Sequence, residues 1–458
     1  MFPLTQDLIA QKEQELQRAL HSADAEVVGS DLALEHLRHP LTGESGYTLP
    51  LTETVAGANL GIVQHANSRC IQFIFPVQGA QPVPAQTPAA PDYQFGFIRP
   101  RQLGPAVQAP TPWRLKAALQ IGPAFAQEMA EAVERMHKAE ALIDLSTGMR
   151  QAVTPAKLRQ SSGQRVLLFI HGIFSSIGGA FGALASPTSA ADGSTAAALL
   201  PELLTRYQGR VFGYDHWTIA KTPLQNACDL LDALPAGANW DVDLVCHSRG
   251  GLLVRALLAE AAAGIRLANE ELAGMAARRA GKIRQVEKVF FVAAANQGSQ
   301  LAEPDDVRNF LNVAALLASL TDCMALDVVI GLARWVVAAG FDLPSVQALA
   351  SGSSLIADLG KTGSLLRNDD CHYARADFDY ATSRLYESAV YIDRYLMQAD
   401  NDLVVPYAGV TLPGDADAPD ERMLAFGTPA QKQHEVWHTE FFKQYRMQQF
   451  LRAALLPA

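Results

Sequence analysis

The sequence predicts an α/β protein whose C-terminal part forms a doubly wound, mostly parallel sheet with an inserted helical cap, preceded by a separate mixed α+β region. Three observations predict this arrangement. The chain has 458 residues, which exceeds one compact core and indicates about two domains. Its pattern changes near residue 150, and from Arg165 onward strand-like runs alternate with helical segments. We therefore expect an N-terminal domain over 1–155 and a second domain over 160–458.

Composition argues against several functional classes. The formal net charge is −10, which does not favour binding to nucleic acid. The first 20 residues resemble an amphipathic helix and lack the features of a secretory signal, so we expect a cytoplasmic protein. The most apolar stretch, Val328–Phe341, is too short to span a bilayer. The five cysteines have no metal-ligand spacing, and no phosphate-binding or dinucleotide-binding glycine motif is present. We therefore expect reduced thiols, no metal and no cofactor.

The N-terminal region contains elements but no recognisable chemistry. Ser68–Val77 is typical of a strand, and a Pro/Ala-rich loop follows over 79–92. Ala124–Ala141 has the apolar periodicity of a helix. We interpret 1–155 as a packing domain or as a surface for a protein partner, and its role stays open.

From Arg165 the elements alternate in a regular order. Arg165–Gly172 (RVLLFIHG) is a continuous apolar run, as expected of a strand buried on both faces. Thr222 and Pro223 predict a capped helix that extends to Leu234. The other predicted elements are strands at Arg210–Thr218, Trp240–Ser248 and Lys288–Gly298, and a helix at Arg249–Ala263. This alternation predicts right-handed crossovers and a site beyond the carboxyl ends of the strands.

The alternation stops over about 303–370, where three apolar segments are typical of helices. We expect them to form a cap over the strand ends, with sheet and helix resuming near His372. The apolar side chains there either face a bound acyl chain or form the cap's own core; they are Leu316, Leu320, Val328, Leu332, Trp335 and Val336.

Ser248 lies at the junction of a predicted strand and a predicted helix, within VDLVCHSRGG. A serine there projects its hydroxyl clear of the sheet, and the helix N-terminus behind it favours developing negative charge. The turn requires small neighbours, which Gly250 and Gly251 provide. Cys246 stands where the G-x-S-x-G motif has its first glycine, and we interpret this small residue as a tolerated variant. An ordinary glycine-rich turn is the alternative.

Residues from about 165 onward resemble the α/β-hydrolase superfamily, close to its lipases and esterases. FIHGIFSS resembles the oxyanion loop of that family, and CHSRGG resembles its nucleophile elbow. ANQGSQLA resembles the small-residue segment after the sixth strand, NDLVVP the acid loop and VWHTEFF the histidine loop. The order Ser, Asp, His along the chain is the order in this family.

The resemblance implies a catalytic triad of Ser248, Asp402 and His438. It implies that the backbone amides of Ile173 and Arg249 form the oxyanion hole.

Other residues near these motifs receive supporting or structural roles. The supporting residues would be His171, Gly172, His247 and Gly250. The side chain of Arg249 is expected to make a structural salt bridge in preference to contacting substrate. His216 and Asp215 are interpreted as structural.

Two positions have rivals. His434 competes with His438 as the base, and we prefer His438 because the aromatic residues of HTEFF can pack its loop. Asp400 competes with Asp402, and the spacing before Pro406 favours Asp402.

The function expected is cleavage of a carboxylic ester, lipid or other acyl ester, through an acyl-enzyme. The alternatives are an acyltransferase or thioesterase with the same triad, or a hydrolase-fold scaffold without turnover.

Overall fold

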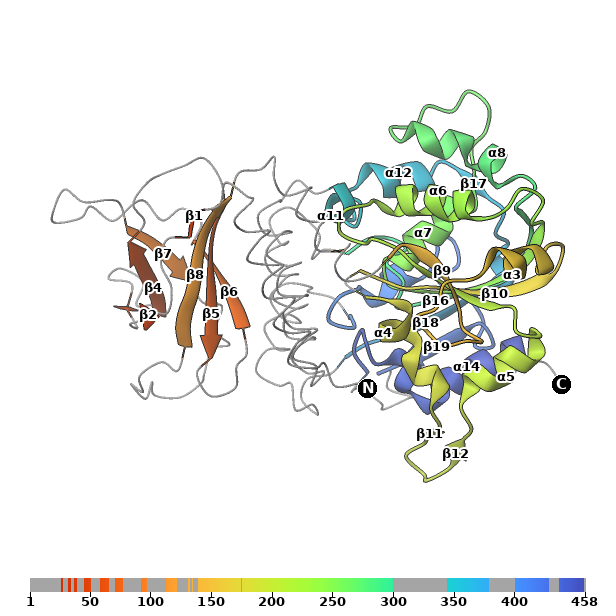
Figure 1. Ribbon diagram of the computed structural model, residues 1–458, viewed down its shortest axis with the longest axis horizontal. Coiled ribbons are helices and arrows are strands. Elements are labelled where there is room, and N and C mark those ends of the chain that lie inside the picture. The colour runs from red at the N-terminus through yellow and green to blue at the C-terminus, as the bar shows by residue number, and fades with distance from the viewer. Residues whose placement is uncertain are drawn as a thin grey trace. The chain divides into compact units, whose positions relative to one another are not determined.

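The computed structural model describes residues 139–173, 175–299, 344–378, 400–427 and 436–456. Within the first 138 residues it describes the backbone of strands β1–β8 and residues 131 and 134. The chain divides into two compact units (Figure 1). The first comprises Met1–His137 and Leu311–Leu343, and the second comprises Lys138–Phe310 and Pro344–Ala458.

The first unit contains an antiparallel sheet with the strand order β1-β8-β5-β6-β7-β4-β3, in which β2 also pairs with β8. The predicted strand Ser68–Val77 corresponds to β6. The Pro/Ala-rich loop before Asp92 lies outside the described residues, as does most of the predicted helix Ala124–Ala141. The strands are β1 (Glu26–Val27), β2 (Leu32–Ala33), β3 (Leu37–Arg38), β4 (Ser45–Pro50), β5 (Ala58–His65), β6 (Ile71–Pro76), β7 (Asp92–Gly96) and β8 (Trp113–Ile121).

The second unit is built on a seven-stranded sheet with the order β19-β18-β16-β14-β10-β13-β9. All neighbouring strands are parallel except β9, which runs antiparallel to β13. From β10 the chain moves outward to β13 and then returns across β10 to β14, so the strand order reverses there. Ligands of such sheets bind at this reversal. The strands are β9 (Ala141–Asp144), β10 (Arg165–Ile170), β13 (Val211–Asp215), β14 (Trp240–His247), β16 (Ile283–Val292), β18 (Cys371–Ala376) and β19 (Met423–Phe426).

Helices cover both faces of this sheet (Figure 1). In β10, Val166 and Leu168 pack in the core under α6 and α7, whereas Leu167 and Phe169 pack under α4, α5 and α14. Each such buried side chain stabilises the fold by about 1.5–3 kcal/mol, which is why a continuous apolar run forms a central strand. The α-helices among the described residues are α3 (Pro155–Gln160), α4 (Ile177–Phe181), α5 (Leu199–Arg206), α6 (Pro223–Ala233), α7 (Gly250–Leu257), α8 (Met275–Arg279), α11 (Pro344–Gln347), α12 (Ser354–Leu359) and α14 (Tyr445–Leu455).

Several predicted elements differ at their ends. Ala141 was expected to end a helix, but it begins β9 by pairing with Asp215 of β13. The sheet unit therefore begins at Lys138, earlier than the expected boundary at 155–160. The helix after Ser248 ends at Leu257 and not at Ala263, because the short strand β15 (Ala259–Glu260) follows and pairs with β17 (Gly363–Ser364). A small hairpin pairs β11 (Thr188–Ser189) with β12 (Thr195–Ala196).

The helix predicted from Thr222 forms as α6. The Thr222 side chain accepts a hydrogen bond from the Gln225 amide, and the Gln225 side chain accepts one from the Thr222 amide. This capping box satisfies two amides at the helix N-terminus. The predicted stop at Leu234 also agrees, because Leu234 is the residue that follows the helix.

Most of the expected cap over about 303–370 lies outside the described residues, including Leu316, Leu320, Val328, Leu332, Trp335 and Val336. In the described part, 344–370, SLIADLG forms α12. Leu355 and Leu359 of this helix join the core beneath α6 and α7. The described part of this segment thus belongs to the helical layer of the sheet.

Candidate active site

Ser248 occupies a strained turn between β14 and α7. Its φ is +56°, a left-handed conformation that costs a non-glycine residue about 1–3 kcal/mol. Its amide donates to the Val292 carbonyl at 3.1 Å, and its carbonyl accepts from the amides of Gly251 and Ala295 at 3.0 and 3.1 Å. These three bonds join the turn to the end of β16, to the segment after β16 and to α7, and they hold it in the geometry expected of a nucleophile elbow.

The glycines around this turn are required by close contacts. A Cβ on Gly172 would lie 2.5 Å from the Ser248 Cβ, and one on Gly250 would lie 2.8 Å from the Ile170 carbonyl oxygen. Cys246, which replaces the first glycine of the motif, is fully buried in the core under α6 and α7. Burial raises the pKa of its thiol well above the usual value, so the group packs as a small neutral side chain.

The structure brings Ser248, His438 and Asp402 together, although the serine and the histidine are 190 residues apart in the chain. The His438 Nε2 lies 2.8 Å from the Ser248 Oγ, and the His438 Nδ1 lies 2.9 Å from the Asp402 Oδ2. All three side chains are buried. This is the geometry in which a carboxylate orients an imidazole and the imidazole accepts the proton of a hydroxyl.

Asp402 is held within a tight loop. Its Oδ1 accepts from the amides of Val404 at 3.0 Å and Val405 at 2.7 Å, which leaves Oδ2 for His438. The carbonyl of Asp402 also accepts from the His438 amide at 3.0 Å. The rival Asp400 has an exposed side chain. The rival His434 lies outside the described residues.

The segment after β16 supports this acid loop, a role that the sequence analysis did not assign. Asn296 Nδ2 donates to the Val410 carbonyl at 2.7 Å, and Ser299 Oγ donates to the Val404 carbonyl at 2.6 Å. The resemblance of ANQGSQLA to the family had marked this segment, but only the fold shows which carbonyls its side chains reach.

His247 joins the elbow to the histidine loop. Its Nε2 lies 2.8 Å from the His438 carbonyl oxygen, and its ring lies 4.8 Å from the His438 ring, centroid to centroid. Burial, together with the neighbouring His438, lowers the pKa of His247 to about 3. The ring is therefore neutral near pH 7, and its Nε2 donates to the carbonyl.

His171 and Gly172 lie beside Ser248 at the end of β10. His171 Nδ1 is 2.8 Å from the Gly172 carbonyl oxygen, and His171 Nε2 accepts the His216 amide at 3.3 Å. Asp215 Oδ1 accepts the Ile177 amide at 2.7 Å and lies 3.5 Å from His171 Nε2. These contacts join His171, His216 and Asp215 in one cluster beside the turn, and the supporting role of His171 and the structural roles of the other two stay predictions.

Arg249 precedes the first residue of α7, and Ile173 follows Gly172 in the loop against Ser248. The Arg249 side chain is fully buried. Its guanidinium donates to the Asn226 Oδ1 at 2.9 Å and to the Lys221 carbonyl, and the salt bridge expected of it stays a prediction. The guanidinium thus holds the loop that precedes α6.

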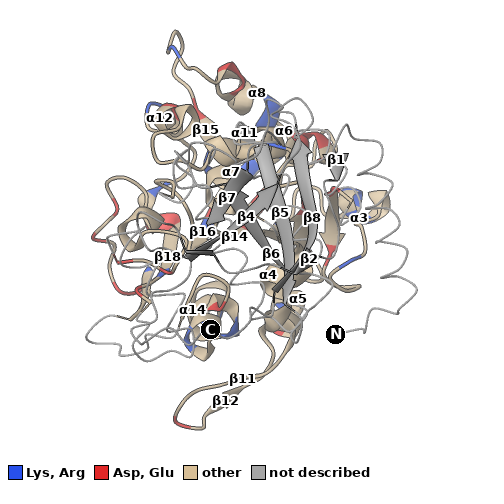
Figure 2. Cartoon of the chain, turned by 90° about the vertical axis from the view of Figure 1, so that its left-hand side faces the viewer, with Lys and Arg blue, Asp and Glu red and all other residues tan. Residues whose placement is uncertain are grey.

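Across the described ranges, no three His, Cys, Asp or Glu side chains come close enough to share a metal ion. Where the structure describes the chain, no helix has the length and apolar character needed to cross a bilayer. Acidic and basic residues are both scattered along the described elements (Figure 2).

A family model described as a domain of unknown function, DUF7379, matches residues 143–456. None of the curated proteins matches this sequence.

Among solved structures, the chain is similar to the lipase BlEst2 of Bacillus licheniformis, with 15% identity and a TM-score of 0.36 over 63% of this chain and 91% of that one. It is similar to lipase 1 of Pelosinus fermentans, with 13% identity and a TM-score of 0.36 over 64% and 97%. A structure from a study of carboxylesterases of Nitrososphaera gargenis matches with 15% identity and a TM-score of 0.31 over 64% and 89%.

Proposed function

The chain belongs to the family of the domain of unknown function DUF7379, and we propose that it is a serine hydrolase that cleaves carboxylic esters through an acyl-enzyme at Ser248. The observation that carries this proposal is the series of contacts from Ser248 Oγ to His438 Nε2 at 2.8 Å and from His438 Nδ1 to Asp402 Oδ2 at 2.9 Å. A free hydroxyl is a weak nucleophile at neutral pH, and this series supplies both the base and the group that orients it.

In the proposed first half-reaction, the Ser248 Oγ attacks the ester carbonyl carbon while His438 Nε2 takes the hydroxyl proton. The carbonyl oxygen becomes an oxyanion, which the amides of Ile173 and Arg249 would stabilise. Each such donor is worth about 3 kcal/mol of barrier. The tetrahedral intermediate then collapses, the C–O bond to the alcohol breaks, and His438 returns the proton to the departing oxygen.

The second half-reaction repeats these steps with water. His438 accepts a proton from water while the water oxygen bonds to the acyl carbon. The bond between that carbon and the Ser248 Oγ then breaks, His438 returns the proton to Oγ, and the carboxylic acid leaves. Asp402 stabilises the imidazolium in both halves and keeps Nε2 directed at the serine. His247, neutral near pH 7, holds the His438 backbone without adding a charge to the site.

Reaction with a fluorophosphonate tests the proposal. We expect the wild type to become labelled at Ser248, and Ser248→Ala and His438→Ala to remain unlabelled although folded. His372→Asn is the matched control. His372 is a buried histidine near the amino end of β18, whereas Ser248 follows the carboxyl end of β14, so this variant should label normally. Labelling that persists in Ser248→Ala, or a folded wild type that never labels, would contradict the proposal.

Hydrolysis of p-nitrophenyl esters of increasing chain length then defines the substrate class. A preference for long chains supports a lipid-like ester, and a preference for short chains supports a small acyl ester. Comparing water with added thiol or alcohol as the acyl acceptor separates hydrolysis from acyl transfer.

A further inference from the structure

The loop His216–Thr222 between β13 and α6, here called the strap, is bonded to the segment that carries Ile173. The His216 amide donates to His171 Nε2 at 3.3 Å, and the two imidazole rings stack with their centroids 4.1 Å apart. His171 is followed by Gly172, which lies against the Ser248 side chain. The first residue of the strap therefore supports one side of the proposed oxyanion hole.

The other end of the strap is held by Arg249, the residue that supplies the second proposed oxyanion donor. Its buried guanidinium donates to the Lys221 carbonyl and, at 2.9 Å, to the Asn226 side chain in α6. The strap is thus bonded to both sides of the site: to Arg249, the residue after Ser248, and to His171, the residue before Gly172.

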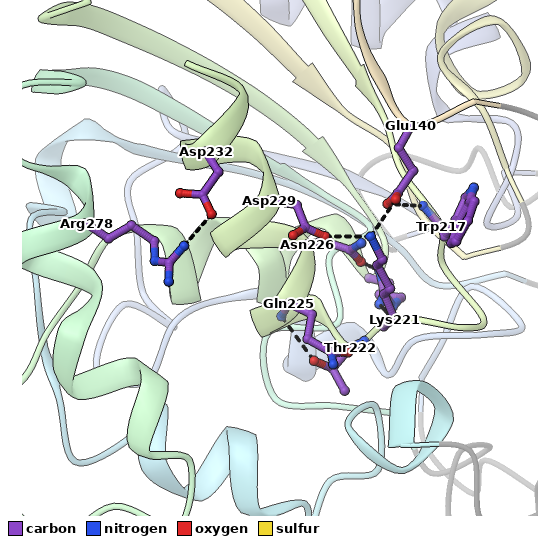
Figure 3. Close-up of polar contacts among 10 residues, drawn as sticks. Glu140, Trp217, Lys221, Thr222, Gln225, Asn226, Asp229, Asp232 and Arg278 are labelled. Atoms are coloured by element: carbon purple, nitrogen blue, oxygen red, sulfur yellow. Dashed lines mark hydrogen bonds and ion pairs between the residues drawn. The ribbon is translucent and has the colours of Figure 1, made fainter. Parts of the chain in front are cut away.

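The outer side of the strap is held by charge. Lys221 Nζ lies 2.5 Å from Glu140 Oε2 and 2.8 Å from Asp229 Oδ2, and the Trp217 amide donates to Glu140 Oε1 at 3.3 Å (Figure 3). Burial opposes the charge of Lys221, but its hydrogen bonds to the two carboxylates outweigh that effect and raise its pKa. Lys221 therefore remains an ammonium that binds the strap to Glu140, the residue before β9, and to Asp229 in α6.

Two residues that contact the strap, Glu140 and Ser345, follow boundaries between the two units along the sequence. Glu140 follows the boundary between His137 and Lys138, and Ser345 follows the boundary between Leu343 and Pro344. Ser345 Oγ donates to the Ile219 carbonyl within the strap. Both contacts lie within the second unit, at positions where the chain has just left the first unit.

We propose that the strap sets the geometry of the oxyanion hole, with Arg249 and Lys221 as positioning residues, and that it makes this geometry sensitive to the chain segments at Glu140 and Ser345. The proposal rests on the ester hydrolysis proposed above. An oxyanion donor acts only at about 2.7–3.1 Å from the developing charge, and a misplacement of about 1 Å can cost a hundredfold in rate. Because the oxyanion exists only along the reaction path, loosening the strap lowers kcat and leaves KM nearly unchanged.

The test compares two buried arginines in the full chain. Arg249→Met removes the guanidinium from the strap. Arg279→Met is the matched control, because Arg279 is also buried. It donates to the carbonyls of Leu257 and Ala259 at the carboxyl end of α7, whereas Ser248 precedes the amino end of that helix.

Arg249→Met should lower kcat by about tenfold to a hundredfold, with KM changed less than about threefold, as expected for a displaced oxyanion donor. It should weaken binding of an alkyl boronic acid, a transition-state analogue, by a similar factor. Arg279→Met should lose stability in urea but keep kcat. Glu140→Gln should lower kcat in the same direction as Arg249→Met and by less, because Asp229 still holds Lys221. Equal kcat values for the two arginine variants would overturn the proposal.

Amide hydrogen exchange gives a reading that does not depend on activity. Exchange over 216–222 and 171–176 should accelerate in Arg249→Met and Glu140→Gln but not in Arg279→Met. Unchanged exchange in these peptides overturns the proposal, even if the wild type proves to be an esterase. A wild type that neither hydrolyses esters nor reacts with fluorophosphonate refutes the hydrolase function, and exchange then decides separately whether the strap couples these segments. If Arg249→Met does not fold, Glu140→Gln and Lys221→Met carry the same comparison.

Discussion

Ser248 and Asp402 lie at the two ends of one hydrogen-bonded series, and the chain holds them in different ways. Ser248 lies in a turn with a φ of +56°, and its sequence neighbour Gly250 leaves room for that turn. Its backbone also bonds to Val292 and Ala295, which belong to a distant segment. Asp402 is held partly by its own loop, through the amides of Val404 and Val405, and partly by groups from distant segments.

The distant groups are what place the acid loop. Ser299, in the segment after β16, donates to the Val404 carbonyl, and the His438 amide donates to the Asp402 carbonyl from the histidine loop. The comparison teaches that a local pattern of small residues marks the elbow in the sequence, although tertiary contacts complete both the elbow and the acid loop. We expect the two to fail differently when altered.

The largest effect on rate is expected from Asp402→Asn. The two backbone amides still find an acceptor in the asparagine oxygen, so the fold should survive. The side-chain amide instead presents a donor to His438 Nδ1, which forces the imidazole into the wrong tautomer, and kcat should fall by about 10³–10⁴. Steady-state ester hydrolysis measures this.

Asp400→Asn is the control for that substitution, because the Asp400 side chain is exposed. It should leave kcat within about twofold, since surface changes away from a site are usually small in effect. An Asp402→Asn variant with activity close to that of Asp400→Asn would remove Asp402 from the proposed mechanism.

The elbow should fail through packing. In Gly250→Ala the new Cβ would lie 2.8 Å from the Ile170 carbonyl oxygen and 2.9 Å from that of His171. Both are backbone atoms and cannot turn aside, so we expect a loss of about 1–3 kcal/mol in the free energy of unfolding, together with reduced labelling at Ser248.

Urea denaturation measures this loss, with Gly352→Ala as control, because a Cβ on Gly352 would have no atom within 4 Å. If both substitutions have the same effect on stability, the close approach of α7 to β10 does not constrain the elbow.

Stability should also depend on pH, through two buried histidines, one of which joins the elbow to the histidine loop. Burial lowers the pKa of His247 to about 3 and that of His372 to about 4, from an ordinary value of 6.5. Below pH 6.5 the unfolded chain therefore binds protons that the folded chain does not. Stability should fall as the pH drops from 6.5 towards 4, by up to about 1.4 kcal/mol per pH unit for each group.

Denaturation at several pH values tests the share of each histidine. His372→Asn should reduce the slope between pH 6.5 and 4 while leaving kcat unchanged, because the His372 ring stacks on Phe290 and lies away from Ser248. A slope that is the same in wild type and in His372→Asn would show that this histidine is not held neutral by the fold.

The sequence predicted the central strands and the elbow because each has a local cause. The run RVLLFI forms β10 because both of its faces are buried, and Thr222 starts α6 because its side chain caps the helix. The sequence did not predict β9, an edge strand of four residues that exists only because β13 offers it hydrogen bonds. It also ended the helix after Ser248 six residues too late, because the pairing of β15 with β17 has no local pattern.

By itself, the sequence determined that a serine stands between a buried strand and a helix, with glycines where the backbone has no room for a side chain. Only the tertiary structure decided that Asp402 and not the exposed Asp400 lies beside His438, and that His247 donates to the His438 backbone. It also decided that the Arg249 side chain donates to the strap. The physical reason is how far apart along the chain the interacting residues are. The small residues that a tight turn needs lie next to it and leave a pattern in the chain, whereas a hydrogen bond between residues 190 positions apart depends on where the whole sheet places them.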